Sequence, residues 1–372
     1  MFRHTVPIGR IFGIAVDLDY SWFLVFGLLT WVLAVSYYPA EFKNWSAGEY
    51  WLIGVMTAVL LFVCVLLHEF GHSVVAKGFG IPVPRITLFI FGGVSQIAEE
   101  PPNAAAEFWI AAAGPAVSFV LAGIFWGLRP LFASAPPLQA LVKYMALLNL
   151  VLGVFNLIPG FPLDGGRVFR SIVWGVTKNF RRATVMAALT GRFFGFILIF
   201  LGVAQVLAGG FLNGLWTAFI GWFLESAAAS QVQQQVMKDL LAGHKVSEIM
   251  SRDCTRVPND LTLQDIVEKH ILAGGHRCFV VSRGEQTIGV LTLTEIRNVA
   301  RASWPTTRVT DVMIPFDKLI STPANAEAMA TIESMGRNGL NQLPVVEDGK
   351  IIGMFSREDL VHYLGLLQSL RA

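Results

Sequence analysis

The sequence has few charged residues for its length. They make up 15% of the 372 residues, whereas an average soluble domain has about 25%. Apolar residues reach 54% and the mean hydropathy is +0.58. This combination indicates a membrane protein over much of the chain. The net charge is only +2 and gives no basic tract for nucleic acid, so direct binding to nucleic acid is not expected.

Cysteine is also scarce. The three cysteines, Cys64, Cys254 and Cys278, lack the spacing of a disulfide framework or of a metal site. The sequence therefore predicts no disulfide framework and fits a reducing compartment. A simple signal peptide is not expected either, because Asp17 and Asp19 precede the first long apolar run.

Long apolar runs dominate the first 230 residues or so. We expect a multi-span α-helical membrane protein with about six transmembrane helices, in runs near 22–38, 51–67, 108–128, 138–157, 193–208 and 212–224. Basic residues gather between residues 167 and 192. The positive-inside rule then places this loop, both termini and the C-terminal part in the cytoplasm of a cell bounded by an inner or plasma membrane.

A shorter apolar segment, Ile86 to Ile90, differs from these runs. It is rich in β-branched and aromatic residues and is bracketed by Pro82, Pro84 and a glycine pair, so it predicts a short re-entrant β element. Such a segment has to be buried in protein or line a cavity. With a free edge it could hold an extended peptide as an added strand. A plain packing loop is an equal alternative.

The most informative stretch is LFVCVLLHEFGH at residues 61–72. His68 and His72 are four residues apart, so both imidazoles share one helix face and can reach one metal ion. Glu69 can take a proton from a water molecule at that metal. An ionisable side chain in a membrane helix costs roughly 2.5 kcal/mol or more, which favours a functional site over buried core polar residues.

A catalytic zinc usually has three protein ligands and one open position. Asp164 is the favoured third ligand, because it follows a broken membrane helix in a turn rich in glycine and proline. A helix cap is the alternative role. Asn156 could donate a hydrogen bond to an oxyanion or to the substrate backbone, or could be a satisfied amide at a helix end. The other candidate third ligands are His4, Glu99, Glu100, Glu107 and Glu225.

These motifs together resemble a known family. HEFGH, then FGGVSQ, an AAAGP helix and FNLIPGFPLDGGRV are similar to the site-2 protease family of intramembrane zinc metalloproteases, over roughly residues 10–225. The resemblance implies that His68, His72 and Asp164 bind one zinc ion, that Glu69 is the catalytic base and that Asn156 contacts the substrate. The family cuts transmembrane segments, often of membrane-bound transcription factors, sigma factors or anti-sigma factors.

The C-terminal part contains a repeat. VSEIM at 246–250 recurs as VTDVM at 309–313, and CFVVSRGEQTIGVLTLTEI is similar to LPVVEDGKIIGMFSREDL. Each copy predicts a strand, a glycine turn, a second strand and a helix start. The copies resemble a pair of CBS domains that fold as one soluble α/β module. The expected divisions are 1–228 for the membrane domain, 229–245 for a linker helix, and 246–305 and 306–372 for the two CBS domains.

CBS pairs often bind adenosine nucleotides, so the resemblance implies ATP, ADP or AMP between the copies. The matching positions are Thr292 with Glu295 and Ser356 with Asp359. A carboxylate can bind both ribose hydroxyls. Glu295 departs from the usual aspartate, which favours the second copy, and a helix cap is the alternative role there. CBS pairs commonly associate further, so a homodimer is compatible with this module.

The leading hypothesis is an intramembrane zinc endopeptidase that lies in the lipid bilayer, acts on a transmembrane protein substrate, and is regulated by nucleotide at its CBS pair. One alternative is a nucleotide-regulated channel or transporter. The intramembrane polar groups form one metal-ligand pattern, which argues against it. A pseudoprotease that binds without cutting is the other alternative, and the intact HExxH with Asp164 argues against it.

Overall fold

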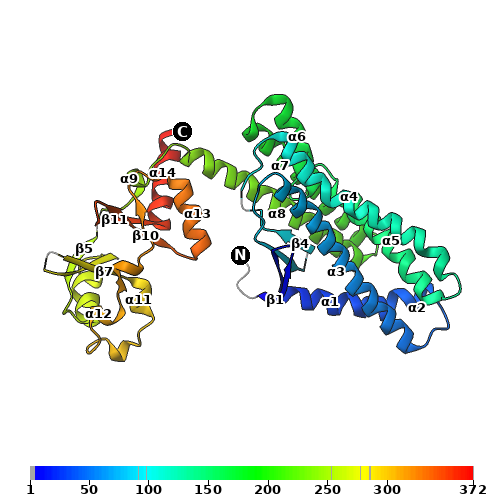
Figure 1. The fold of residues 1–372 in the computed structure, drawn as a ribbon, viewed down its shortest axis with the longest axis horizontal. Helices are drawn as coiled ribbons and strands as arrows, with labels where there is room; N and C mark the ends of the chain where they lie inside the picture. Colours follow the sequence, from blue (N-terminus) through cyan, green and yellow to red (C-terminus); the bar gives the residue numbers. More distant parts are fainter. Residues whose placement is uncertain are drawn as a thin grey trace. The chain divides into compact units, whose positions relative to one another are not determined.

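The computed structural model describes residues 5–371 except Phe91, Ala98, Asp253, Arg277 and Glu285. The chain forms two compact units, Met1–Gln235 and Val236–Ala372. The first unit is mainly helical, and the second mixes short strands with helices (Figure 1). The prediction of a multi-span helical part followed by an α/β module is therefore confirmed.

Long helices build the first unit. Among the described residues, five segments are long and apolar enough to cross a membrane: Tyr20–Glu41, Ala47–Gly78, Ala104–Phe132, Pro136–Asn156 and Phe180–Leu207. The sixth predicted run, 212–224, lies in α8, which continues as one helix and is not among these five. The helices are α1 (Tyr20–Val32), α2 (Tyr38–Glu41), α3 (Ala47–Gly78), α4 (Ala104–Leu128), α5 (Pro136–Asn156), α6 (Asp164–Thr177), α7 (Phe180–Leu207) and α8 (Phe211–Leu241).

Local capping fixes where α3 and α4 begin. Ser46 and Glu49 form a capping box, in which each side chain accepts a hydrogen bond from the backbone N–H of the other residue. Asn103 caps α4 by accepting from the backbone N–H of Ala106 at 2.9 Å. Because α3 runs for 32 residues, its HEFGH sequence falls in the last third of the helix.

A four-stranded sheet packs beside α3, with strand order β1-β2-β3-β4. The predicted strand is present as β3, which pairs in parallel with β2 and antiparallel with β4. The N-terminal hairpin of β1 and β2 was not predicted. Ile14 and Ile86 of the sheet share a buried core with Phe70 and Ala76 of α3. The strands are β1 (Thr5–Ile11), β2 (Ile14–Asp19), β3 (Arg85–Phe89) and β4 (Gly92–Ser95).

The second unit contains two similar hairpins. β6 pairs with β7 and β10 pairs with β11, and each hairpin has a register shift at its matching position. The strand orders are β5-β6-β7-β8 and β11-β10-β9. The strands are β5 (Thr255–Pro258), β6 (Cys278–Arg283), β7 (Gln286–Thr292), β8 (Ile314–Pro315), β9 (Thr322–Pro323), β10 (Gln342–Glu347) and β11 (Lys350–Ser356). The helices are α9 (Val246–Ile249), α10 (Leu263–Asp265), α11 (Leu293–Arg297), α12 (Val309–Val312), α13 (Ala328–Asn338) and α14 (Arg357–Arg371).

The repeated five-residue segments are exchanged between the copies. Val246 and Ile249 of the first segment are buried with Val345 in the core of the second copy. Val309 of the second segment is buried with Phe279 in the core of the first. Neither core is complete without a segment from the other repeat, which explains why the two repeats form a single compact unit.

Candidate active site

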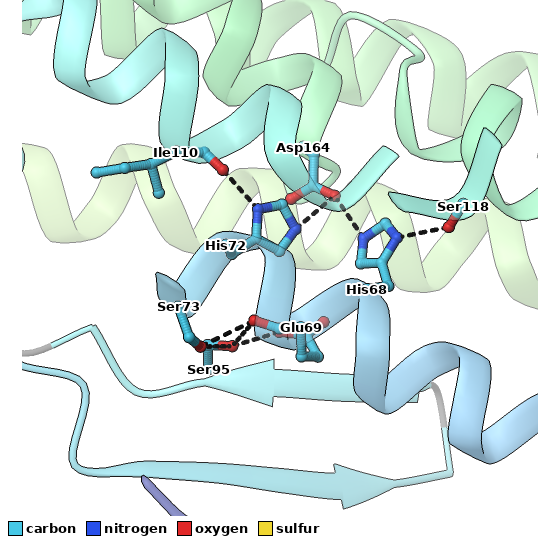
Figure 2. A network of polar contacts seen from close by, with 8 residues as sticks. All are labelled: His68, Glu69, His72, Ser73, Ser95, Ile110, Ser118 and Asp164. Atoms are coloured by element: carbon cyan, nitrogen blue, oxygen red, sulfur yellow. Dashed lines mark hydrogen bonds and ion pairs between the residues drawn. The ribbon is translucent and has the colours of Figure 1, made fainter. Parts of the chain in front are cut away.

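The structure brings together the three predicted metal ligands. His68 Nε2 and His72 Nε2 of α3 lie 3.0 and 3.2 Å from Asp164 Oδ2, at the first residue of α6 (Figure 2). The side chains are 4%, 5% and 16% exposed. Among the described residues, this is the one group of three or more histidine, cysteine and acidic side chains whose ligand atoms all lie within 4.8 Å of one another.

The hydrogen bonds of the two imidazoles suit metal ligation. His72 Nδ1 donates to the carbonyl oxygen of Ile110 at 2.7 Å, so in the neutral ring the lone pair lies on Nε2. His68 Nδ1 lies 2.8 Å from Ser118 Oγ. The Nε2 lone pair of His72 therefore faces a carboxylate oxygen, an arrangement that a cation between them stabilises. Two imidazole nitrogens and a carboxylate are a donor set that zinc accepts.

One face of α4 supports both histidines. Ile110, Gly114 and Ser118 are spaced four residues apart, so they lie on the same side of the helix. A Cβ atom at Gly114 would overlap the His72 ring and would lie 2.6 Å from His68 Nε2. Only glycine leaves room for the two imidazoles at this position. At the sequence level AAAGP was only part of the family resemblance, and this role of Gly114 was missed.

Backbone contact positions Asp164. The chain turns between α5 and α6 through a cis peptide bond at Phe161–Pro162. A Cβ at Gly165 would collide with the backbone of Leu157, which follows the last residue of α5. The start of α6 therefore lies directly against the end of α5. The N-cap of α6 is Leu163 and makes no side-chain cap, so Asp164 does not adopt the alternative capping role.

Glu69 lies on the side of α3 that faces β4, away from Asp164 (Figure 2). Its Oε2 accepts a hydrogen bond from Ser95 Oγ of β4 at 2.6 Å. A Cβ at Gly93 would lie 2.5 Å from Glu69 Cγ, so the strand packs directly on this side chain. The candidate base is therefore held by the outer strand of the sheet.

The other candidate third ligands lie elsewhere. Glu107 is fully buried and accepts from Arg170, and Glu225 accepts from Arg192 Nε at 2.8 Å. Glu99 and Glu100 are exposed and do not belong to the cluster. His4 lies outside the described residues. Asn156 is the half-buried last residue of α5, before the turn that leads to Asp164. Its contact with the substrate stays a prediction.

A buried ion pair between α4 and α6 was missed at the sequence level. Arg170 Nε donates to Glu107 Oε1 at 2.7 Å, and its guanidinium lies over the rings of Phe161 and Phe180. Glu107 precedes Ile110 by one turn of α4, and Arg170 follows Asp164 on α6. The pair thus joins the helix that supports the histidines to the helix that carries the aspartate. The available signal was Glu107 at the start of an apolar helix, where a buried carboxylate needs a charged partner.

The four predicted nucleotide contacts act as helix caps here. Glu295 accepts hydrogen bonds from the backbone and hydroxyl of Thr292. Asp359 Oδ2 accepts from the backbone N–H of Ser356 at 3.1 Å. Ser356 and Asp359 also line a cavity of about 740 Å³ in the second unit, whereas Thr292 and Glu295 are not among its lining residues.

Both parts of the chain match known protein families. Residues 56–135 and 132–202 match the profile of peptidase family M50, and residues 246–302 and 309–366 match the CBS domain. The putative zinc metalloprotease Rip3 of Mycobacterium tuberculosis is 33% identical over 97% of this chain and 93% of its own length. The putative zinc metalloprotease sll0528 of Synechocystis is 33% identical over 97% and 96%. A solved site-2 protease from Methanocaldococcus jannaschii is 27% identical, with a TM-score of 0.43, and covers 62% of this chain and 95% of its own.

Proposed function

This chain belongs to peptidase family M50, the site-2 proteases, and we propose that His68, His72 and Asp164 hold its zinc ion and that Glu69 is its catalytic base. The chain is an integral membrane zinc metalloprotease with a C-terminal CBS pair. Its relatives give no support to the channel, transporter or pseudoprotease alternatives. The convergence of two imidazole nitrogens and one carboxylate from α3 and α6 is the observation that carries the residue assignment.

Zinc bound by these residues would polarise the scissile carbonyl and lower the pKa of a water molecule toward ~7. Glu69 accepts the proton of the attacking water and later passes it to the leaving amine. Ser95 donates to Oε2, which fixes the carboxylate and leaves Oε1 for the proton. Ile110 and Ser118 hold the two imidazoles in place through their Nδ1 atoms.

The substrate is a transmembrane segment that has to unwind, because the carbonyls of a helix are hydrogen-bonded and shielded. β4 is the last strand of its sheet and pairs with β3 on one side. We propose that the unwound segment adds to the other edge, beside Glu69. Asn156 donates to the substrate backbone from the end of α5. Substitution of β4 residues by proline should then raise KM for cleavage, and an unchanged KM would contradict the strand assignment.

The physiological substrate we propose is a membrane-bound transcription factor, sigma factor or anti-sigma factor.

The basic residues in and before the first turn of α7, such as Lys178, Arg181 and Arg182, support a cytoplasmic position for this side of the unit. With α8 as a sixth span, both termini and the CBS pair then face the cytoplasm, and the CBS pair supports a homodimer. Protection of the CBS pair from protease in right-side-out vesicles checks the orientation, because cleavage there would contradict it.

Metal content tests the ligand assignment. We expect about one zinc per chain in purified wild-type protein and less than a tenth of that in His68→Ala and Asp164→Ala, because each loses one of three ligands. Glu225→Gln is the control, since Glu225 pairs with Arg192 outside the cluster. Zinc is measured by mass spectrometry beside cleavage of a transmembrane substrate in detergent. Retained zinc in Asp164→Ala would remove Asp164 as a ligand, and metal-free wild type would overturn the zinc site.

We propose that an adenine nucleotide binds the cavity beside Ser356 and Asp359, where the carboxylate holds the ribose hydroxyls. Asp359→Ala should weaken AMP binding by about 10- to 100-fold, as expected for a lost hydrogen bond to a charged group. Glu295→Ala is the matched control, because it removes the corresponding cap of the first copy. Calorimetry on the full chain measures both affinities. Equal weakening in the two variants would contradict the choice of the second copy.

A further inference from the structure

Cys254 and Cys278 lie side by side in the second unit, although 24 residues separate them in the sequence. Their Sγ atoms are 2.7 Å apart. Cys254 immediately precedes β5 and Cys278 opens β6. The two strands are parallel neighbours in which Thr255 pairs with Phe279, so the two cysteines are adjacent one step earlier. The positions of the two cysteines in the sequence did not indicate this pair, because it depends on the register between β5 and β6.

The backbone already has the spacing that a disulfide needs. Neighbouring strands lie about 4.8 Å apart, and disulfides join residues whose Cα atoms are about 4.4–6.8 Å apart. The sulfur atoms therefore need only a small side-chain adjustment to reach a bond of about 2.05 Å. No movement of β5 against β6 is required.

The position of the pair gives the bond a structural consequence. Cys278 is 6% exposed and lines the cavity that also contains Ser356 and Asp359. Ser251, three residues before Cys254, exchanges two backbone hydrogen bonds of 2.8 Å with Met354 of the second copy. A bond between the cysteines would tie this segment to β6 of the first copy. It would thus fix a connection between the two repeats at the wall of the cavity.

We propose that Cys254 and Cys278 are a modification site that forms a reversible intrachain disulfide with a low-molecular-weight disulfide as oxidant. The more exposed Cys254 thiolate attacks one sulfur of the oxidant, forms a mixed disulfide and releases one thiol. The Cys278 thiolate then attacks the Cys254 sulfur and releases the second thiol. Two cysteine thiols lose two electrons and two protons, and the oxidant becomes two thiols. In a reducing compartment the dithiol is the resting state.

Equilibration of the full-length protein with oxidised and reduced glutathione tests this site without any proteolysis assay. We expect two of the three thiols to disappear on oxidation, with a mass loss of two hydrogen atoms and no covalent dimer, and to return on reduction. Thiols are counted with a maleimide after denaturation, and intact mass is measured without reductant.

Single substitutions identify which two cysteines form the disulfide. Cys64→Ser should still form the intrachain bond, because Cys64 lies in α3 of the first unit. Cys278→Ser should stop at a mixed disulfide with glutathione on Cys254, and Cys254→Ser should form no intrachain bond. The proposal is overturned if wild type keeps all its thiols in oxidised glutathione, if the bond joins two chains, or if either Cys254→Ser or Cys278→Ser still loses two hydrogen atoms.

Discussion

Gly114→Ala should empty the metal site and lower proteolysis more than about 100-fold, a loss at or beyond the upper end reported for residues that support metal ligands. The added Cβ would overlap the His72 ring and lie 2.6 Å from His68 Nε2. The imidazoles would have to turn away, and they would then lose their bonds to Ile110 and Ser118. Zinc content of the purified protein and cleavage of a transmembrane substrate measure the two effects.

Gly127→Ala is the control for this substitution. Gly127 lies in the same helix, and a Cβ there would meet no atom within 4 Å. Alanine favours a helix over glycine by about 1 kcal/mol, so neither variant should weaken α4 itself. Gly127→Ala should keep full zinc content and activity. Normal zinc in Gly114→Ala would show that the imidazoles of His68 and His72 do not lie against Gly114.

The spacing of residues along one segment could be predicted from the sequence. His68 and His72 share a helix face because an α-helix has 3.6 residues per turn, and this holds in any fold that keeps α3. The strand over Ile86 to Ile90 was predicted correctly, because its β-branched and aromatic residues fit a buried strand. Glycine and proline after Asn156 indicated the break that brings Asp164 back toward α3. Each of these signals lies within a short stretch of chain.

Contacts between remote segments could not be predicted in this way. The support of His68 by Ser118 joins positions 50 residues apart, and the pair of Glu107 and Arg170 joins positions 63 apart. The exchange of repeated segments between the CBS copies also depends on tertiary packing. Residue chemistry alone left Glu107 and Asp164 both open as third ligands. The packing of α4 on α6 distinguishes the two candidates, because it pairs Glu107 with Arg170 and leaves Asp164 beside the histidines.

Glu69→Gln should keep its zinc and lose proteolysis by about 10²- to 10⁴-fold, the usual contribution of general acid–base catalysis. Glutamine has nearly the same shape and can still accept a hydrogen bond from Ser95, so the packing between α3 and β4 should persist. It cannot take a proton from the attacking water. Zinc content and the kcat for a transmembrane substrate, measured on one preparation, separate the base from the ligands.

Ser95→Ala sharpens the test of Glu69, because it removes the hydroxyl that holds Oε2 and leaves the carboxylate able to accept a proton. It should lower kcat by only about tenfold, in line with one lost hydrogen bond. Zinc loss in Glu69→Gln would instead make Glu69 part of the metal site. Full activity of Glu69→Gln with zinc bound would move the base to another residue. Zinc retained in Glu69→Gln but lost in Gly114→Ala would assign metal binding to the imidazoles that α4 supports and proton transfer to the carboxylate that β4 holds.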